Sequence, residues 1–459
     1  MCTESEKISI PNPGQLALLL TAALAQAAWA ESGDAPTQQT PAQTETASPS
    51  AETGVASGGK WFDATTSAGQ QAFTPNYEQS GRGLGGGVKT APARGVPIRT
   101  SSGIFIYPGV KVGLGYNDNI LGTPTDPASS SLVTLQPGVV GEMKSHGDRY
   151  TASYAGNYTE YAGRSSDNFN HHTLMLAGDN IFTSRARLSW DAGYNIGTDP
   201  RGSTDRAIST EPDRWHSPVA SAMFAYGAPG ATGRVELEAS VQNKRYDNNR
   251  ASTESADVNL SIVSGRFFYR VAPKTSMLFE LRDSKADYQL ATSLLDNTER
   301  RYYVGATWEA TAATTGIIKV GRLTKDFNDT GSAGFTGSSW EGTVRWKPLT
   351  YSAFDLVTSK STSDSTGFGN YLVNQNVSVA WNHNWNSYLA SRLTAGVLKS
   401  DFAGTDRNDN TRNYGLGLTY DMRRWLRVGV EWAGTQRNSS LPLYDFTRNV
   451  AMLTLEGTL

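Results

Sequence analysis

Cysteine is almost absent from this 459-residue chain, which contains only Cys2. An apolar run follows over residues 16–30, with Lys7 upstream and an Ala-Trp-Ala end. The run is short of the roughly 20 residues that a helix needs to cross a bilayer, and it has the form of a secretory signal peptide. We therefore predict a cleaved signal peptide over residues 1–30 and a mature, exported chain with no disulfide to stabilise it.

Charge is also scarce in the sequence. Asp, Glu, Lys and Arg make up 18% of the chain, below the usual quarter, and the formal net charge is -2. A chain so close to neutral has no bulk attraction for nucleic acid, so we expect no nucleic-acid partner. Mean hydropathy is negative, at -0.43, which argues against a protein that crosses a membrane with several apolar helices.

Motifs of catalysis and metal binding are missing as well. No cysteine or histidine cluster has the spacing of a zinc site, and no Gly-x-Ser-x-Gly elbow appears. His171 and His172 are adjacent in a predicted strand, so they point to opposite faces and are poorly placed to chelate one metal. We expect no enzyme activity, no cofactor and no metal. The alternative is a site at the loop tops, which would need His171, His172 or His216 beside an acid.

Residues 31–95 have little to bury. They consist mainly of Ser, Thr, Ala, Gln, Pro and Gly, a composition that predicts a disordered polar linker. The stretch GRGLGGG at 81–87 weakly resembles a phosphate-binding loop, but it does not lie between a strand and a helix. We interpret it as a flexible lead-in, with a short plug or a partner-binding tail as the alternative.

From residue 96 to residue 459, apolar and polar residues alternate with a period of two. In GRVELEASVQNK (233–244), for example, Val235 and Leu237 fall opposite Glu236 and Glu238. This period indicates strands, and no segment shows a helical period. Many runs cover 12 or more residues, whereas strands of soluble sheets usually have about 5 to 6. Transmembrane strands need roughly 9 to 11 residues plus extensions, so the length favours a membrane barrel.

The runs predict an all-β fold over residues 96–459, a closed antiparallel up-and-down transmembrane β-barrel of about 18 strands. Tight connections such as 146–148 alternate with long ones such as 198–212, as short periplasmic turns alternate with long outer loops in such barrels. Closure leaves no unpaired edge in lipid. The predicted strands cover residues 104–117, 131–144, 148–161, 169–181, 184–197, 213–226, 231–246, 255–270, 274–289, 297–310, 314–327, 337–347, 350–362, 370–383, 387–401, 411–422, 425–438 and 446–459.

The two faces of these strands differ in chemistry. The apolar face is expected to contact outer-membrane lipid, and aromatic residues such as Tyr116 and Trp346 lie near strand ends, as in interfacial girdles. The opposite face carries charges that an aqueous lumen would solvate. These charges are either a wet pore wall without individual roles or contacts for a polymer, and their mixed signs argue against strong ion selectivity. The predicted lumen-lining residues are Arg187, Asp191, Glu236, Glu238, Glu280, Arg282, Glu341, Arg345, Arg392, Arg427 and Glu431.

Asparagine and aspartate recur where predicted strands end, at 116–119, 246–249, 326–329 and 406–410. Calcium prefers such oxygen ligands, but none of the four stretches has the EF-hand spacing. Asn and Asp also begin turns by bonding their own backbone. We therefore predict turns rather than calcium loops.

Two early stretches carry a family resemblance. GVKVGLGYNDNIL (109–121) and SLVTLQPGVVGEM (131–143) resemble the start of the porin-like outer-membrane β-barrel proteins associated with capsular and exopolysaccharide synthesis and export. The resemblance extends loosely over residues 103–459. It implies an outer-membrane barrel that acts in polysaccharide export, with polysaccharide and periplasmic export components as partners and no catalytic residues. The chain departs from the pattern of most outer-membrane barrels by ending in Leu459 instead of an aromatic residue.

The sequence therefore leads to one preferred function and two alternatives. The first is a channel or scaffold for export of an extracellular or capsular polysaccharide. The alternatives are a general diffusion porin for small solutes and a surface barrel whose loops bind other molecules.

Overall fold

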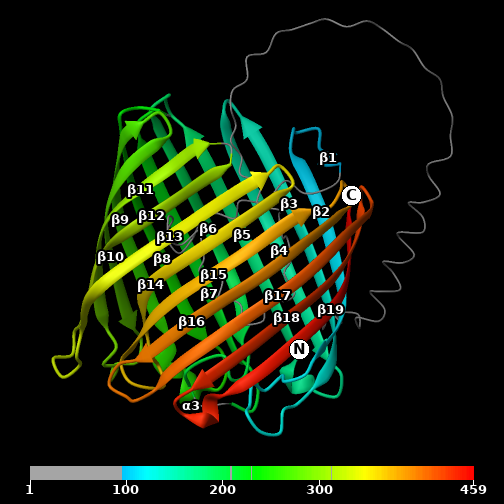
Figure 1. The fold of residues 1–459 in the computed structure, drawn as a ribbon, viewed down its shortest axis with the longest axis vertical. Coiled ribbons are helices and arrows are strands. Elements are labelled where there is room, and N and C mark those ends of the chain that lie inside the picture. The colour runs from blue at the N-terminus through cyan, green and yellow to red at the C-terminus, as the bar shows by residue number, and fades with distance from the viewer. Residues whose placement is uncertain (1–95, 207–208, 229, 312) are drawn as a thin grey trace, which may run out of the picture. The chain divides into compact units, whose positions relative to one another are not determined.

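The computed structural model describes residues 96–459 except 207, 208, 229 and 312. The predicted signal peptide and linker lie outside the described residues. Eighteen antiparallel strands, β2 to β19, form a closed barrel, because the last strand, β19 (Phe446–Thr458), pairs with the first, β2 (Phe105–Asn117) (Figure 1). The other strands of the first half are β3 (Ser130–Ser145), β4 (Asp148–Tyr161), β5 (Phe169–Ile181), β6 (Ala186–Asp199), β7 (Asp213–Tyr226), β8 (Gly233–Tyr246), β9 (Val258–Ala272) and β10 (Thr275–Tyr288).

The second half of the wall continues the meander without a crossover. Each strand pairs with the strands before and after it in the chain. These strands are β11 (Asn297–Thr311), β12 (Thr314–Phe327), β13 (Phe335–Leu349), β14 (Ser352–Asp364), β15 (Tyr371–Asn384), β16 (Leu389–Phe402), β17 (Asn408–Arg423) and β18 (Leu426–Ser439).

All eighteen predicted strands are confirmed, and no predicted end differs from the observed end by more than three residues. One short strand, β1 (Ile98–Arg99), was not predicted, since two residues show no periodicity. It pairs with Ile106 and Phe105 of β2. These two residues lie on the short-turn side of Gly109, which is paired with Thr458, the last residue of β19. β1 therefore extends the seam of the barrel at the rim where the chain enters it.

Alternation along each strand separates an apolar outside from a polar inside. In β10, Phe279 and Leu281 are 45% and 51% exposed, whereas Glu280 and Arg282 are 4% and 7% exposed. The exposed side chains form an apolar outer surface of the kind that faces lipid in transmembrane barrels. Exposed aromatic residues such as Trp346 lie near strand ends on the same surface. The predicted assignment of the apolar face to the outside is thus confirmed.

Short and long connections lie at opposite ends of the barrel. The turn between β3 and β4 consists of His146 and Gly147 alone, both with positive φ (53° and 95°). At the other end, long loops carry the helical turns, and by the usual arrangement this is the extracellular end. Among the described residues, no helix is long and apolar enough to cross a membrane. The helical turns are η1 (Ser165–Asp167), α3 (Arg250–Thr253), η2 (Glu254–Ala256) and η3 (Pro442–Tyr444).

The Asn-Asp-Asn triplet that ends β2 forms a turn and joins the seam. Asn119 donates its backbone N–H to Asn117 Oδ1 at 3.0 Å and accepts from the backbone N–H of Gly122 at 3.0 Å. Asp118 accepts from the backbone and side-chain N–H groups of Asn449 at 2.6 and 2.7 Å. Local turn formation therefore accounts for the triplet, as predicted.

Glycine at one barrel position is required by the approach of two backbones. A Cβ on Gly321 of β12 would lie 1.8 Å from the carbonyl oxygen of Tyr302 on β11. We expect Gly321→Ala to force the two strands apart and to destabilise the barrel by about 1 to 3 kcal/mol. The midpoint of the heat-dependent gel shift should fall accordingly.

Gly265→Ala in β9 is the matched control, because its Cβ would meet only Leu237 Cδ2 at an ordinary 3.7 Å. Equal midpoints for the two variants would contradict this account of β11 and β12.

Candidate functional site: the lumen and its outer mouth

The inner wall of the barrel is lined by acids and bases that pair with one another. On β8 and β9, Arg266 lies between two carboxylates. Its Nε donates to Glu236 at 2.9 Å and its terminal nitrogen to Glu238 at 2.5 Å. The side chains of Arg266 and Glu238 are 4% and 3% exposed. Two predicted lumen residues are thus neutralised by a cation on the next strand.

A second cluster joins β10, β12 and β13. Arg282 donates to Glu280 and to Glu341 at 2.9 Å each, and the Lys319 ammonium lies 2.8 Å from Glu280 and 2.6 Å from Glu341. Arg301 of β11 adds a third cation 3.3 Å from Glu341. All of these side chains are at least 85% buried. The cluster therefore has both signs in contact and forms a dense part of the wall.

The other predicted lumen residues lie around the rest of the ring. Most of them meet a polar partner on a neighbouring strand, so the structure places them on one face, although no role in polymer contact follows from this. Arg187 lies near the short-turn end and is exposed. The partners are Asp355 for Arg345 (2.5 Å), Asn382 for Arg392 (2.7 Å), Asp421 for Arg427 (2.8 Å), Lys111 for Glu431 (2.9 Å) and Ser221 for Asp191 (2.5 Å).

Four cations that complete these pairs, Lys111, Arg266, Arg301 and Lys319, were not among the predicted lumen residues. Lys319 stands between Ile318 and Val320 in β12, and Arg266 precedes the outward-facing Phe267 in β9. Both positions alternate with exposed apolar residues, so the same period that identified the acids could have identified them. What the period could not supply is the register that places each cation opposite its acid.

Of the three histidines considered for a site at the loop tops, only His216 has an acid as its direct side-chain partner. His216 Nδ1 lies 2.8 Å from Asp247 Oδ1, and both residues are partly exposed. His171 instead contacts Thr198 Oγ1 at 2.7 Å, and His172 contacts Tyr154 at 2.9 Å. Within the described part of the chain, no three His, Cys, Asp or Glu residues are grouped to hold a metal ion.

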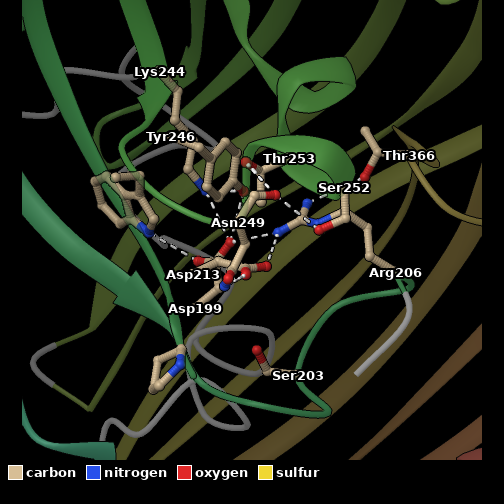
Figure 2. A network of polar contacts seen from close by, with 12 residues as sticks. Asp199, Ser203, Arg206, Asp213, Lys244, Tyr246, Asn249, Ser252, Thr253 and Thr366 are labelled. Carbon is tan, nitrogen blue, oxygen red and sulfur yellow. Dashed lines mark hydrogen bonds and ion pairs between the residues drawn. The ribbon is translucent and has the colours of Figure 1, made fainter. Parts of the chain in front are cut away.

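The extracellular mouth is crossed by residues 200–206, which follow β6 and are here named the mouth segment. Arg206 anchors the segment to the wall beside it (Figure 2). Its guanidinium lies 2.8 Å from Asp213 and 3.4 Å from Asp199 and stacks 4.7 Å from the centre of the Tyr246 ring. Burial alone lowers the pKa of Arg206, but Tyr246 and Asp213 outweigh it and hold the pKa above its ordinary value. This anchor therefore keeps its charge at any physiological pH.

Asp199 is the centre of the same network. It accepts hydrogen bonds from Tyr246 Oη at 2.6 Å and from Trp215 Nε1 at 2.9 Å, and the Lys244 ammonium lies 3.3 Å away (Figure 2). Its donors come from β7 and β8, so the base of the mouth segment is tied to two neighbouring strands.

The hairpin of β14 and β15 bends inward from the opposite side of the mouth. Beyond Lys360, β14 no longer pairs with β13, and β15 is its only partner strand. Asp364, at the end of β14, lies 2.6 Å from the Lys325 ammonium and accepts from Tyr288 Oη at 2.8 Å. Lys325 and Tyr288 belong to β12 and β10, so the hairpin tip leans over the lumen.

The mouth segment and the hairpin tip meet at Asp205. Its carboxylate accepts from Ser365 Oγ at 2.5 Å and from the backbone N–H groups of Thr366 and Gly367 at 2.9 and 3.1 Å. The strands that carry the two elements, β6 and β15, are nine positions apart in the ring of eighteen. A connection between diametrically opposed strands therefore spans the mouth.

The closed ring of long strands, the apolar outside and the polar inside define a membrane-spanning barrel of the outer-membrane type. The family model described as "Putative beta-barrel porin 2" matches residues 100–458. The chain belongs to this family, and it is a porin-like barrel of the outer membrane.

Solved structures of outer-membrane proteins are similar to this chain at low identity. The FrpB iron transporter (F5-1 variant) from Neisseria meningitidis is 11% identical, with a TM-score of 0.43 over 73% of this chain, which spans only 64% of that transporter. OccAB3 from Acinetobacter baumannii (9% identical) and OpdK from Pseudomonas aeruginosa (12%) each give a TM-score of 0.44, covering 77% of this chain and 99% of theirs. No curated protein matches the sequence.

The paired wall predicts unequal effects of removing two arginines. Arg266→Gln would leave Glu236 and Glu238 buried without their cation, which should destabilise the barrel by about 3 to 5 kcal/mol. The midpoint of thermal unfolding in detergent is the measurement.

Arg300→Gln is the control, because Arg300 pairs with Asp283 at 3.0 Å while both side chains are about half exposed, and such pairs contribute about 0 to 1 kcal/mol. A similar loss of stability in both variants would show that burial of the first pair is unimportant.

Proposed function

We propose that this porin-like barrel is a channel for carbohydrate and takes part in export of an extracellular or capsular polysaccharide. The observation that supports it best is the neutralisation of the inner wall. Glu238 lies against Arg266, Glu341 against Arg282, and Glu431 against Lys111. A wall of paired charges has no extended stretch of one sign to attract or repel an ion, whereas it offers donors and acceptors to hydroxyl groups.

Uncharged polar residues add to this property on β3 and β4. Thr134 and Gln136 are 2% and 1% exposed on the inner face, and Gln136 Nε2 is 3.5 Å from Asn157 Oδ1. Amide and hydroxyl groups bind sugars by direct and water-mediated hydrogen bonds. A polymer with many hydroxyl groups would find partners at half-buried polar positions such as Asn157, and periplasmic export components would deliver it at the short-turn end.

The connection across the mouth favours this proposal over a general diffusion porin. A porin for small solutes has to stay open, whereas the contact of Asp205 with Ser365 spans the mouth. One observation also supports a general diffusion porin, because a wall of paired charges suits unselective passage of small solutes. Loops that bind other molecules are the third candidate, and the polar network around Asp199 faces the same outer end.

Electrical recording and a deletion strain test the proposal together. We expect the purified barrel in a planar bilayer to show long closed periods, because the mouth is crossed, and a cation-to-anion permeability ratio near one, because the wall is neutralised. Loss of the protein should reduce extracellular polysaccharide. Normal polysaccharide in the deletion strain, together with a large and permanently open conductance, would instead identify a general diffusion porin.

A further inference from the structure

We infer that the mouth segment, residues 200–206, is a lid with one fixed side and one releasable side. The inference rests on the proposed channel function and concerns how the same mouth is opened. The two sides differ in how many independent groups hold them. That difference decides which contact of the lid breaks first when a polymer passes through the lumen.

The fixed side is held by several side chains from different elements. Arg206 contacts Asp213 and Asp199, and Arg201 Nε donates to Asp167 of η1 at 2.7 Å. The Asp167 side chain is 2% exposed, so this ion pair is sheltered from water and salt. Losing any one of these contacts leaves the others in place.

The releasable side depends mainly on one carboxylate. Four donors from residues 365–367 converge on Asp205, namely the hydroxyl groups of Ser365 and Thr366 and the backbone N–H groups of Thr366 and Gly367. Arg206 adds a single bond to Thr366 Oγ1 at 3.2 Å. Charge-assisted hydrogen bonds of this kind are strong, but they break together when one group moves away. The clasp between Asp205 and residues 365–367 therefore acts as one unit.

Close approach of the two backbones requires glycine in the clasp. A Cβ on Gly367 would lie 2.2 Å from the carbonyl oxygen of Asp205. Because the clash is with backbone, no rotation of a side chain relieves it. A larger residue at 367 should therefore hold the two elements apart. The same Cβ would lie 2.9 Å from the Cα of Arg206, so the backbone of both Asp205 and Arg206 has to move away from residue 367.

The direction of opening follows from the position of the lid. The segment crosses the extracellular end, so a polymer that fills the lumen from the periplasm meets it last and from inside. A ligand shifts an equilibrium only by the difference in its interaction with the two states. A chain in the mouth is compatible only with the open state, and the clasp is the side that has fewer independent contacts to lose.

Two substitutions test the clasp in planar bilayers. We expect Asp205→Asn, which removes the charge, and Gly367→Leu, which separates the backbones, each to raise the ratio of open to closed time by about tenfold, the effect of losing one charge-assisted hydrogen bond. Gly331→Leu in the loop after β12 is the control, since its Cβ would approach only the Asp329 side chain of its own loop, at 3.3 Å. Unchanged open times in both clasp variants would overturn the inference.

A reversible cross-link gives a second, independent readout. Asp205→Cys with Ser365→Cys replaces two side chains whose oxygens are 2.5 Å apart, in a chain whose only natural cysteine is removed by Cys2→Ser. The oxidised channel should stay closed and should open on addition of a reductant, whereas either single cysteine should be insensitive. An oxidised channel that conducts as freely as the reduced one would show that the lid lies outside the conducting path.

The lid and the export role can fail separately. Bilayer recording needs no polysaccharide, so a working clasp in a barrel whose deletion leaves polysaccharide secretion normal would retain the lid and reject export. Failure of both clasp variants and of the cross-link, together with lost secretion in the deletion strain, would retain export and reject the lid.

Discussion

The whole structure depends on closing the ring between β19 and β2. In lipid, a strand with one unpaired edge would leave its N–H and C=O groups without any partner, at several kcal/mol each. Nine residue pairs, from Val450 with Asn117 to Thr458 with Gly109, remove that edge. At both ends of this seam the chain adds further bonds. β1 pairs with β2 beyond the short-turn end of the seam, and Asp118 accepts a hydrogen bond from Asn449 at its extracellular end.

Once the ring is closed, the period of the strands determines the chemistry of both surfaces. Each strand must present alternate residues to lipid and to the lumen, so most of the charge within the wall is placed on the inner face. Buried charges that lie so near one another are costly unless each is paired with the opposite sign. The register of the strands supplies these pairs, as with Glu280 and Lys319. The inner wall is therefore neutral because of packing as much as because of the solute that passes.

The barrel could be predicted from the sequence because its two signals, period and length, are local. Strand ends, the inward position of residues such as Glu341, and the turn at Asn117 all follow from neighbours in the chain. The partners of these residues do not. Glu431 meets Lys111 across 320 residues of sequence, and Asp205 meets Ser365 across 160. Such contacts depend on ring closure and on the inward bend of the hairpin after Lys360, and neither leaves a pattern in the residues.

The bend after Lys360 also explains why the mouth can move while the wall cannot. Along the wall each strand has two neighbours, and the buried cluster of Glu280, Lys319 and Glu341 links three strands at once. At the tip of the hairpin, β14 has lost its pairing with β13, whereas β15 stays paired with β16 up to Leu372. Asp364 and the clasp hold the β14 side of the tip. Segments with few backbone partners open at lower free energy than the strands around them. A barrel built this way concentrates its conformational freedom at the outer mouth, where passage through the lumen can be controlled without disturbing the seam.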